Sequence, residues 1–294
     1  MPLAEPISTD LTAEAVAISG LIVRPAAESD LPLVPATSRR RVRLFGIEID
    51  ALRMPEAVAQ VCNWVARRDG TCRYIVTPNV DHAVMFQEDE ALRRAYAEAG
   101  LVLADGAPLV LASRWLGKPL PERVAGSDLV PALFDATGDD SPLRVFLLGG
   151  APGVAERAAV NLEARWPAVT VVGTASPPKG FEHDASQNAA ILARIAKACP
   201  DVLLIGLGAP KQELWVRRHR RAIAAPVALC IGATIDFLAG ERSRAPRWMR
   251  RAGLEWLYRI GTEPRRLGRR YCRDASVFPR LVWKEWRNRG TGNR

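Results

Sequence analysis

Two apolar runs late in the chain end in glycine and lead at once into polar side chains, the arrangement from which ligand sites are built. Residues 202–207 are followed by Gly208 and then by a Lys-Gln-Glu triplet that includes Gln212. Residues 227–231 are followed by a glycine and a threonine, and then by Asp236. Glycine lets a ligand approach the backbone closely, and a carboxylate among apolar residues needs a partner because an unpaired buried charge is costly. We expect the triplet and Asp236 to face a shared cleft, the alternative being that the glycines only pack a helix on a strand.

An aspartate and a Thr-Pro-Asn segment follow two earlier apolar runs. Asp105 comes directly after residues 101–104 and before a glycine. A carboxylate at the carboxyl end of a strand is well placed for a general base, although Asp-Gly is also ordinary turn chemistry. Thr77 and Asn79 stand at the end of the run 73–77 and just beyond it. They either bind sugar hydroxyls or, in the case of Thr77, cap a helix that opens with the proline between them.

The segment VFLLGGAPGVAE has the form of a phosphate-binding turn. Gly149 and Gly150 follow an apolar run and precede a helix start, where free N–H groups and the helix dipole favour an anion. The spacing is GGxxG rather than the GxGxxG of dinucleotide-binding proteins, and no Walker lysine follows. The acidic residue expected about 20 positions further on is also missing. The segment therefore predicts a phosphate but weighs against an NAD(P)-dependent oxidoreductase.

These segments belong to a recurring alternation of strand and helix. The apolar runs are continuous, which is typical of strands covered on both faces, and repeated strand–helix units predict a mostly parallel sheet with right-handed crossovers. Ligands bind outside the carboxyl ends of such strands. The predicted fold is α/β, a Rossmann-like, mostly parallel sheet with helices on both faces and a small, basic, helical C-terminal appendage. A first helix is predicted over residues 54–68, and the predicted strands are residues 41–49, 73–77, 101–104, 144–148, 170–172, 202–207 and 227–231.

Basic charge is concentrated near the C-terminus. Residues 241–294 contain 16 Lys and Arg against 5 Asp and Glu, a net charge of +11, whereas the other 240 residues contain 25 against 27, a net of −2. Such asymmetry predicts a segment that meets something anionic. Tryptophans alternate with arginines there, and the expected elements are short basic helices over residues 245–258, 264–274 and 276–288.

The chain is therefore divided into three parts. Its first residues are rich in Pro, Ala, Ser and Thr without a sustained period, as in a flexible leader. The predicted parts are the leader (residues 1–40), a Rossmann-like catalytic domain (residues 41–243) and the basic appendage (residues 244–294).

Several other classes of protein find no support. No window approaches the roughly 18 apolar residues of a membrane-spanning helix, and the N-terminal segment lacks the basic start of a signal peptide. The five cysteines are scattered without a CxxC, as expected of reduced intracellular thiols, and the three histidines do not cluster with them, so no zinc site is predicted. The best remaining metal candidate, the Glu-Asp-Glu of residues 88–90, is expected to be a solvated helix face.

Five motifs together resemble one family, the bacterial glycosyltransferases of the WecG/TagA/CpsF family. They are TPN at residues 77–79, ADG at 104–106, LGG at 148–150, GAPKQE at 208–213 and GATIDFLAG at 232–240, in the family's order. Residues 244–271 look like the family's C-terminal signature, and the resemblance covers about residues 42–273. It implies an inverting transferase that needs no metal or cofactor. Such an enzyme moves N-acetylmannosamine or glucose from a UDP-sugar to a polyprenyl-pyrophosphate-linked sugar, in cell-surface or exopolysaccharide synthesis.

The resemblance also implies roles for individual residues. Asp105 matches the proposed catalytic base, and one carboxylate suffices for an inverting transfer. The matches to substrate-binding positions are Thr77, Asn79, Gln212, Asp236 and the appendage arginines Arg259, Arg266 and Arg269. Those arginines are thought to close over the diphosphate, whose growing charge guanidinium groups can stabilise. After Gly173 many relatives carry Tyr-rich sequence near the uracil, whereas this chain offers only Phe181, so no base-stacking residue is predicted.

The expected partners are a UDP-sugar, the lipid-linked acceptor and an anionic membrane surface, with no nucleic acid. The resemblance implies a cytoplasmic enzyme, peripheral on the inner face of the plasma membrane. A nucleic-acid-binding protein is the competing class, but no recognition-helix motif is present, and mixed Trp and Arg favour a lipid headgroup region. The donor sugar and self-association into a homo-oligomer stay open.

Overall fold

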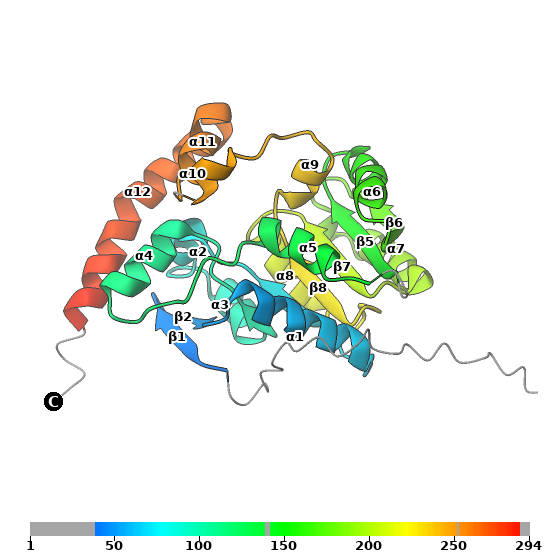
Figure 1. Cartoon of the computed structure of the whole chain (residues 1–294), viewed down its shortest axis with the longest axis horizontal. Coiled ribbons are helices and arrows are strands. Elements are labelled where there is room, and N and C mark those ends of the chain that lie inside the picture. Colours follow the sequence, from blue (N-terminus) through cyan, green and yellow to red (C-terminus); the bar gives the residue numbers. More distant parts are fainter. Residues whose placement is uncertain (1–38, 139–141, 252, 289–294) are drawn as a thin grey trace, which may run out of the picture.

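The computed structural model describes residues 39–138, 142–251 and 253–288, so the predicted leader lies outside the described residues except for its last two positions. The described chain forms a six-stranded, all-parallel sheet with helices on both faces (Figure 1). This arrangement confirms the predicted α/β fold. The sheet consists of β3 (Arg73–Val76), β4 (Leu101–Val102), β5 (Leu143–Gly149), β6 (Val169–Ala175), β7 (Val202–Gly206) and β8 (Val227–Cys230). The remaining strands and the helices up to residue 243 are β1 (Arg41–Leu44), β2 (Ile47–Asp50), α1 (Met54–Arg67), α2 (Val80–Met85), α3 (Glu90–Ala97), α4 (Ala107–Trp115), α5 (Gly126–Asp135), α6 (Val154–Arg165), the 3-10 helix η1 (Phe181–His183), α7 (Ala185–Ala198), α8 (Lys211–His219) and α9 (Thr234–Leu238).

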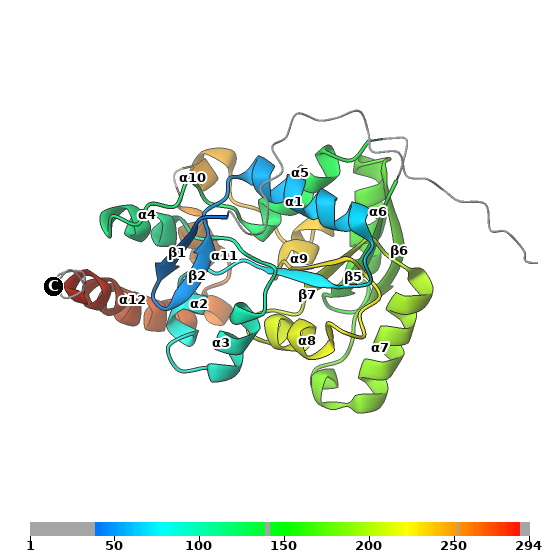
Figure 2. The same cartoon turned by 90° about the horizontal axis from the view of Figure 1, so that it is seen from below.

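Each central strand divides its side chains between two hydrophobic cores. In β7, Val202 and Leu204 belong to the core on one face of the sheet, and Leu203 and Ile205 belong to the core on the other. Successive side chains of a strand point to opposite faces, so a strand buried on both faces must be apolar throughout. Helices α1, α5 and α6 cover one face, and α3, α7 and α8 cover the other (Figure 2). The continuous apolar runs of the sequence thus have their cause in burial from both sides.

The order of the strands places a crevice near the middle of the sheet. The order is β4-β3-β8-β7-β5-β6. The chain first lays down β3 and β4 at one edge, crosses to form β5 and β6 at the other, and fills the centre with β7 and β8. Since all six strands are parallel, their carboxyl ends share one edge of the sheet. The loops that follow β3, β4, β7 and β8 therefore meet where ligands bind in open α/β sheets.

The single strand predicted over residues 41–49 is wrong, because the segment is a hairpin. Strands β1 and β2 pair antiparallel around a turn of Phe45 and Gly46, whose φ angles are 54° and 86°. Two positive φ angles give the two-residue turn whose twist matches the flanking strands. Asp50 fixes the hairpin beside the sheet, since its Oδ2 accepts the backbone N–H of Val102 at 2.9 Å.

The appendage contains α10 (Arg247–Arg251), α11 (Glu255–Thr262) and α12 (Pro264–Arg287). The last two of the three short helices that we predicted are in fact one, and α12 continues through Pro279. A proline inside a helix removes one backbone hydrogen bond, but α12 is supported along its length by the rest of the protein. The Phe278 ring packs edge-on against Phe45 at 5.3 Å between centroids, and Trp286 stacks on Trp115 of α4 at 6.3 Å. In Figure 1, α12 runs past α2 and α4.

Gly149 ends β5 where that strand passes very close to β7. Its φ is 130°, and a Cβ at this position would lie 2.4 Å from the carbonyl oxygen of Gly206. No side chain fits at such a distance. Close approach of two neighbouring strands is thus sufficient by itself to require glycine here.

We expect Gly149→Ala to destabilise the protein by about 1–3 kcal/mol for the strained backbone and by about 1–3 kcal/mol more for the overlap with β7. Gly180→Ala is the matched control, because Gly180 has a φ of 86° but no atom within 4 Å of a built Cβ. Urea denaturation of both variants measures the difference. Equal losses of unfolding free energy in the two variants would contradict the close-approach explanation.

Candidate active site

A cavity of about 700 Å³ lies at the carboxyl ends of β3, β4, β7 and β8, and residues of α11 and α12 complete its lining. Its size is within the range of small-molecule sites. Six of the residues proposed from the sequence line it, namely Thr77, Asn79, Asp105, Gly208, Gln212 and Arg259. The structure thus brings strand-end residues and an appendage arginine to one place.

Other residues proposed from the sequence lie elsewhere. Gly149 and Gly150 are not among the cavity residues, and neither are Asp236 and the exposed Arg269. Asp236 has the partner that a carboxylate in this setting needs, since its Oδ2 lies 3.2 Å from Nε of Arg242. The side chain of Arg266 lies outside the described residues.

Of the Lys-Gln-Glu triplet, only Gln212 lines the cavity. The expectation for Lys211 is wrong, because its Nζ turns to the carboxylate of Glu182 at 3.0 Å. The expectation for Glu213 is also wrong, because this side chain is fully buried within the protein. The first turn of a helix spreads three successive side chains over different directions, about 100° apart, so they cannot all face one cleft.

Asp105 lies in the loop after β4, with its carboxylate at the cavity. Its backbone N–H donates to the carbonyl of Pro78 at 2.8 Å, which holds Asp105 beside Asn79. Burial raises the pKa of Asp105 to about 7, although the cation of Arg123, with Nη1 3.5 Å from Oδ1, opposes the rise. The nearby carboxylate of Glu255 adds to it. A carboxylate with a pKa near neutrality is suited to act as a general base.

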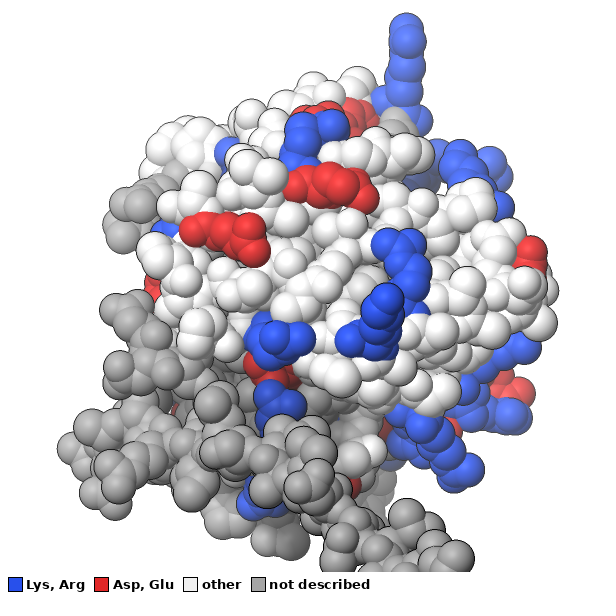
Figure 3. Space-filling view, turned by 90° about the vertical axis from the view of Figure 1, so that its right-hand side faces the viewer, with Lys and Arg blue, Asp and Glu red and all other residues white. Residues whose placement is uncertain are grey.

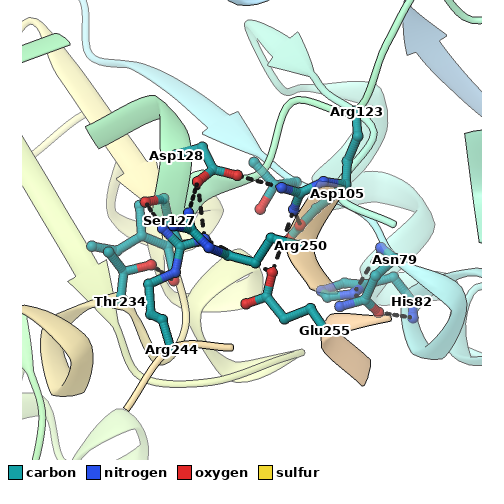
Figure 4. Close-up of polar contacts among 12 residues, drawn as sticks. Asn79, His82, Asp105, Arg123, Ser127, Asp128, Thr234, Arg244, Arg250 and Glu255 are labelled. Atoms are coloured by element: carbon teal, nitrogen blue, oxygen red, sulfur yellow. Dashed lines mark hydrogen bonds and ion pairs between the residues drawn. The ribbon is translucent and has the colours of Figure 1, made fainter. Parts of the chain in front are cut away.

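Arg123 joins carboxylates from three parts of the chain (Figure 4). Its guanidinium binds Asp128 in the first turn of α5, and its Nη1 lies 3.5 Å from Asp105 and 3.8 Å from Glu255 of α11. Arg244 approaches the same group, with Nη2 2.9 Å from Asp128 and 3.8 Å from Glu255. These five residues, here called the arginine–carboxylate cluster, fasten α11 and the segment before α10 to the rest of the protein beside Asp105. Arg123 was not predicted from the sequence, because it lies in a loop without a motif.

The N-cap residue of α2 is Asn79, not Thr77, which was the candidate from the sequence. A second set of polar contacts begins at the side chain of Asn79. Oδ1 of Asn79 lies 2.9 Å from Nδ1 of His82, and Nε2 of His82 lies 3.3 Å from Oε1 of Glu213. The same Oε1 accepts a hydrogen bond from Nε2 of Gln212 at 2.8 Å. Oε1 of Gln212 in turn accepts the backbone N–H of Gly232 at 3.1 Å. A buried imidazole and a buried carboxylate thus connect two cavity residues, Asn79 and Gln212.

His82 has polar partners at both ring nitrogens. Nδ1 lies 2.9 Å from Oδ1 of Asn79 and also 3.4 Å from the backbone N–H of Asn79. Nε2 faces the carboxylate of Glu213, which favours a proton on that nitrogen. Burial lowers the pKa of His82, but the hydrogen bond to Glu213 and its charge outweigh this effect, and the pKa is raised. The imidazole ring thus lies between the side chain of Asn79 and that of Glu213. His82 stands one helical turn after Asn79, a spacing that was not used in predicting the site from the sequence.

Comparison with known proteins gives a consistent result. The model of the glycosyl transferase WecG/TagA/CpsF family matches residues 42–292. An N-acetylglucosaminyldiphosphoundecaprenol N-acetyl-beta-D-mannosaminyltransferase of Bacillus spizizenii is 31% identical over 193 residues, which cover 66% of this chain and 72% of the relative. A protein of the same description from Staphylococcus aureus (strain NCTC 8325 / PS 47) is 28% identical over 233 residues, which cover 78% of this chain and 87% of the relative.

The buried His82–Glu213 contact predicts an abnormal titration. In the wild-type protein we expect His82 to titrate above 6.5, the ordinary value. In Glu213→Gln the opposing charge is lost while burial remains, so the pKa of His82 should fall by about 1–3 units. The chain contains three histidines, and NMR titration of the imidazole protons resolves them.

An unchanged pKa of His82 in the variant would contradict the contact. The raised pKa of His82 also makes the stability of the fold depend on pH. Because the folded-state pKa of His82 is raised, the stabilisation from the pair is complete below pH 6.5 and is lost as the pH rises through the folded-state value.

Proposed function

This chain belongs to the WecG/TagA/CpsF family of glycosyl transferases, and from this premise we propose that it transfers a sugar from a UDP-sugar to a sugar linked to polyprenyl diphosphate. N-acetylmannosamine is the first donor sugar to consider, because the relatives from B. spizizenii and S. aureus are described as N-acetylmannosaminyltransferases. Glucose, the other donor sugar that the family resemblance implies, is the second. The observation that carries the proposal is Asp105, a carboxylate with a raised pKa at the cavity.

In the proposed reaction an acceptor hydroxyl attacks the anomeric carbon of the donor sugar. The new C–O bond forms as the bond to the β-phosphate of UDP breaks, the hydroxyl proton passes to Asp105, and UDP leaves with the bonding electrons. A β-linked product from an α-linked donor requires inversion by one such displacement. The relatives' descriptions specify a β-mannosaminyl product, which supports this course for the present chain.

Arginines at the cavity supply positive charge for the leaving diphosphate in this proposal. Arg123, Arg250 and Arg259 all line the cavity, and Arg259 lies over the Phe237 ring, 5.6 Å from its centroid. Guanidinium groups are always charged and match the geometry of phosphate oxygens. Charge placed where the transition state becomes negative is an effective form of catalysis. Across the described ranges of the chain, no group of three His, Cys, Asp or Glu side chains is arranged to hold a metal ion.

We also propose that α4 and the appendage lie on an anionic membrane. Among the described residues, the exposed large apolar side chains other than Val160 of α6 all belong to these helices: Leu111, Trp115, Trp248, Trp256, Leu257, Trp283 and Trp286. On the face of the molecule around α6 and β6, away from α12, charged side chains of both signs are scattered among uncharged ones (Figure 3). Trp favours headgroup depth, and each basic residue near an anionic surface contributes about 1 kcal/mol. No described helix has the length and apolar character needed to cross a bilayer.

The reaction is tested by offering the protein UDP-N-acetylmannosamine, UDP-glucose and other UDP-sugars with a short-chain N-acetylglucosaminyl-diphospho-lipid. We expect a β-linked disaccharide from one donor, identified by mass and by NMR. Asp105→Asn should lower kcat/KM by about 100- to 10,000-fold, the usual contribution of a general base, and wild-type kcat/KM should fall about tenfold per pH unit below about pH 7, where Asp105 becomes protonated.

Asp69→Asn, which removes an exposed carboxylate before the amino end of β3, is the matched control and should keep full activity. Asp105→Asn should also raise the Tm at pH 8. The raised pKa means that the native state binds the Asp105 proton more tightly than the unfolded chain does, so this carboxyl group weakens the fold as the pH rises from about 4 to 7. Absence of transfer from every donor would overturn the proposed function. Full activity of Asp105→Asn would remove Asp105 from the mechanism.

For the membrane surface we expect the double variant Trp115→Ala/Trp286→Ala to bind phosphatidylglycerol vesicles on the order of 50-fold more weakly. This value corresponds to about 50 Å² of each ring at about 25 cal/mol per Å². Val160→Ala, an exposed apolar change on α6, should bind like wild type. Sedimentation with vesicles measures both, and wild-type binding by the double variant would exclude this surface.

A further inference from the structure

Asp274 of α12 is a buried carboxylate at the cavity whose inner oxygen has no hydrogen bond. The residue is 4% exposed and lines the cavity. Its Oδ1 is buried without a hydrogen-bond partner among the described residues. The Nη2 atom of Arg273 is 3.8 Å from it, beyond hydrogen-bond distance. Buried polar groups in native proteins nearly always have a partner, so an oxygen like this one calls for an explanation.

The arginines that could neutralise Asp274 are engaged by another carboxylate. Nη2 of Arg273 lies 2.8 Å from Oδ1 of Asp81, and Nη1 of Arg270 lies 3.5 Å from its Oδ2. Asp81 thus holds both cations on the contact between α2 and α12. Burial and the negative charge of Asp81 raise the pKa of Asp274 to about 6. Among the described residues, no donor forms a hydrogen bond with Oδ1 of Asp274.

The surroundings of Asp274 suit an uncharged polar ligand. The same part of α12 contributes Ala275, Phe278 and Pro279 to the cavity lining. Aromatic and aliphatic surface combined with a few polar groups is the usual lining of a site that fixes a small molecule. The carboxylates of Asp81 and Asp274 are balanced by the charges of Arg270 and Arg273, so this part of the cavity has no excess positive charge to bind a phosphate.

The arginine–carboxylate cluster lies toward the other end of the cavity. In Figure 4, Asp105 lies between Asn79 and His82 on one side and Thr234 and Arg244 on the other. Asp81 precedes His82 on α2. Arg273 lies between Asp81 and Asp274, with Nη2 2.8 Å from the first carboxylate and 3.8 Å from the second, so Asp274 lies beside α2. Arg250, Arg259 and Phe237 line the cavity from α9–α11. Glu255 of α11 and Arg270 of α12 line it as well, so arginines outnumber carboxylates toward α9–α11, whereas charges of both signs meet toward α2.

We propose that Asp274 is a sugar-binding residue, whose carboxylate accepts a hydrogen bond from a hydroxyl or acetamido N–H of one of the two reacting sugars. The inference rests on the proposed function and extends it, since it gives α12 a part in choosing the sugar. The donor sugar and the acceptor sugar offer the same hydrogen-bond donors, and separate measurements for each substrate distinguish them. Asp274 takes no part in bond breaking, so its contribution is to binding.

The test compares Asp274→Ala and Asp274→Asn with wild type, using the UDP-sugar that the wild-type protein accepts and the short-chain acceptor. Asp274→Ala should raise KM for one of the two substrates by about ten- to hundredfold, the range for a hydrogen bond to a charged group, with kcat nearly unchanged. Asp274→Asn keeps an accepting oxygen and should raise the same KM less. UDP alone, titrated calorimetrically, should bind all three proteins within twofold.

Monodeoxy and deacetylated substrates then identify the group involved. For the substrate that lacks the contacted group, Asp274→Ala should have no further effect on KM, as expected for two changes that remove one interaction. Glu285→Ala is the matched control. Its carboxylate also joins α12 to the body, through Lys118 at 2.7 Å, but it does not line the cavity, so both KM values should stay at wild-type levels.

Three results would overturn the inference. If Asp274→Ala lowers Tm and leaves both KM values unchanged, the residue is only structural. If it weakens UDP binding as much as substrate binding, it does not recognise a sugar. If the wild-type protein transfers no sugar at all, the proposed function fails and this inference fails with it, an outcome that wild-type activity separates from the other two.

Discussion

One guanidinium within reach of three carboxylates is the contact on which the cavity depends. Arg123 contacts Asp105 after β4, Asp128 at the start of α5 and Glu255 of α11. The four side chains are 18–29% exposed, so these ion pairs are partly shielded from water. Helix α11 and the loops after β4 and before α5 are therefore joined at the place where the proposed chemistry occurs. The same contact also affects the pKa of the proposed base, because the cation of Arg123 limits the rise in the pKa of Asp105.

Helix α12 faces two environments because helical periodicity separates its side chains. Arg270, Asp274 and Phe278 are spaced by four and line the cavity, as expected for positions that share one helix face. Trp283 and Trp286, further along, are about half exposed. A helix of 24 residues is about 36 Å long, so one element reaches from the cavity to the proposed membrane surface. In the proposed reaction this arrangement places the acceptor sugar near the lipid that carries it.

Much of the fold and part of the site could be predicted from local sequence. Continuous apolar runs predict buried parallel strands, and the six strands of the sheet lie where such runs occur. Parallel strands bring their carboxyl ends to one edge, so Asn79, Asp105 and Gln212 meet although more than 130 residues separate the first from the last. The hairpin at Phe45 and the continuous α12 were missed, because a two-residue turn and a tolerated proline depend on packing with distant segments.

The sequence by itself determined the type of sheet and the edge where a ligand would bind, since both follow from local hydrophobic pattern and strand direction. Only the tertiary structure decided which polar side chains reach the cavity. Gly149 and Asp236 belong to motifs, but Gly149 serves the packing of β5 against β7 and Asp236 pairs with Arg242. Arg123 and Asp274 belong to no motif that was used for prediction, and both line the cavity. The physical reason is that a buried charged side chain needs a partner, so its position depends on which partners lie near it in space. Those partners come from segments far away in the chain.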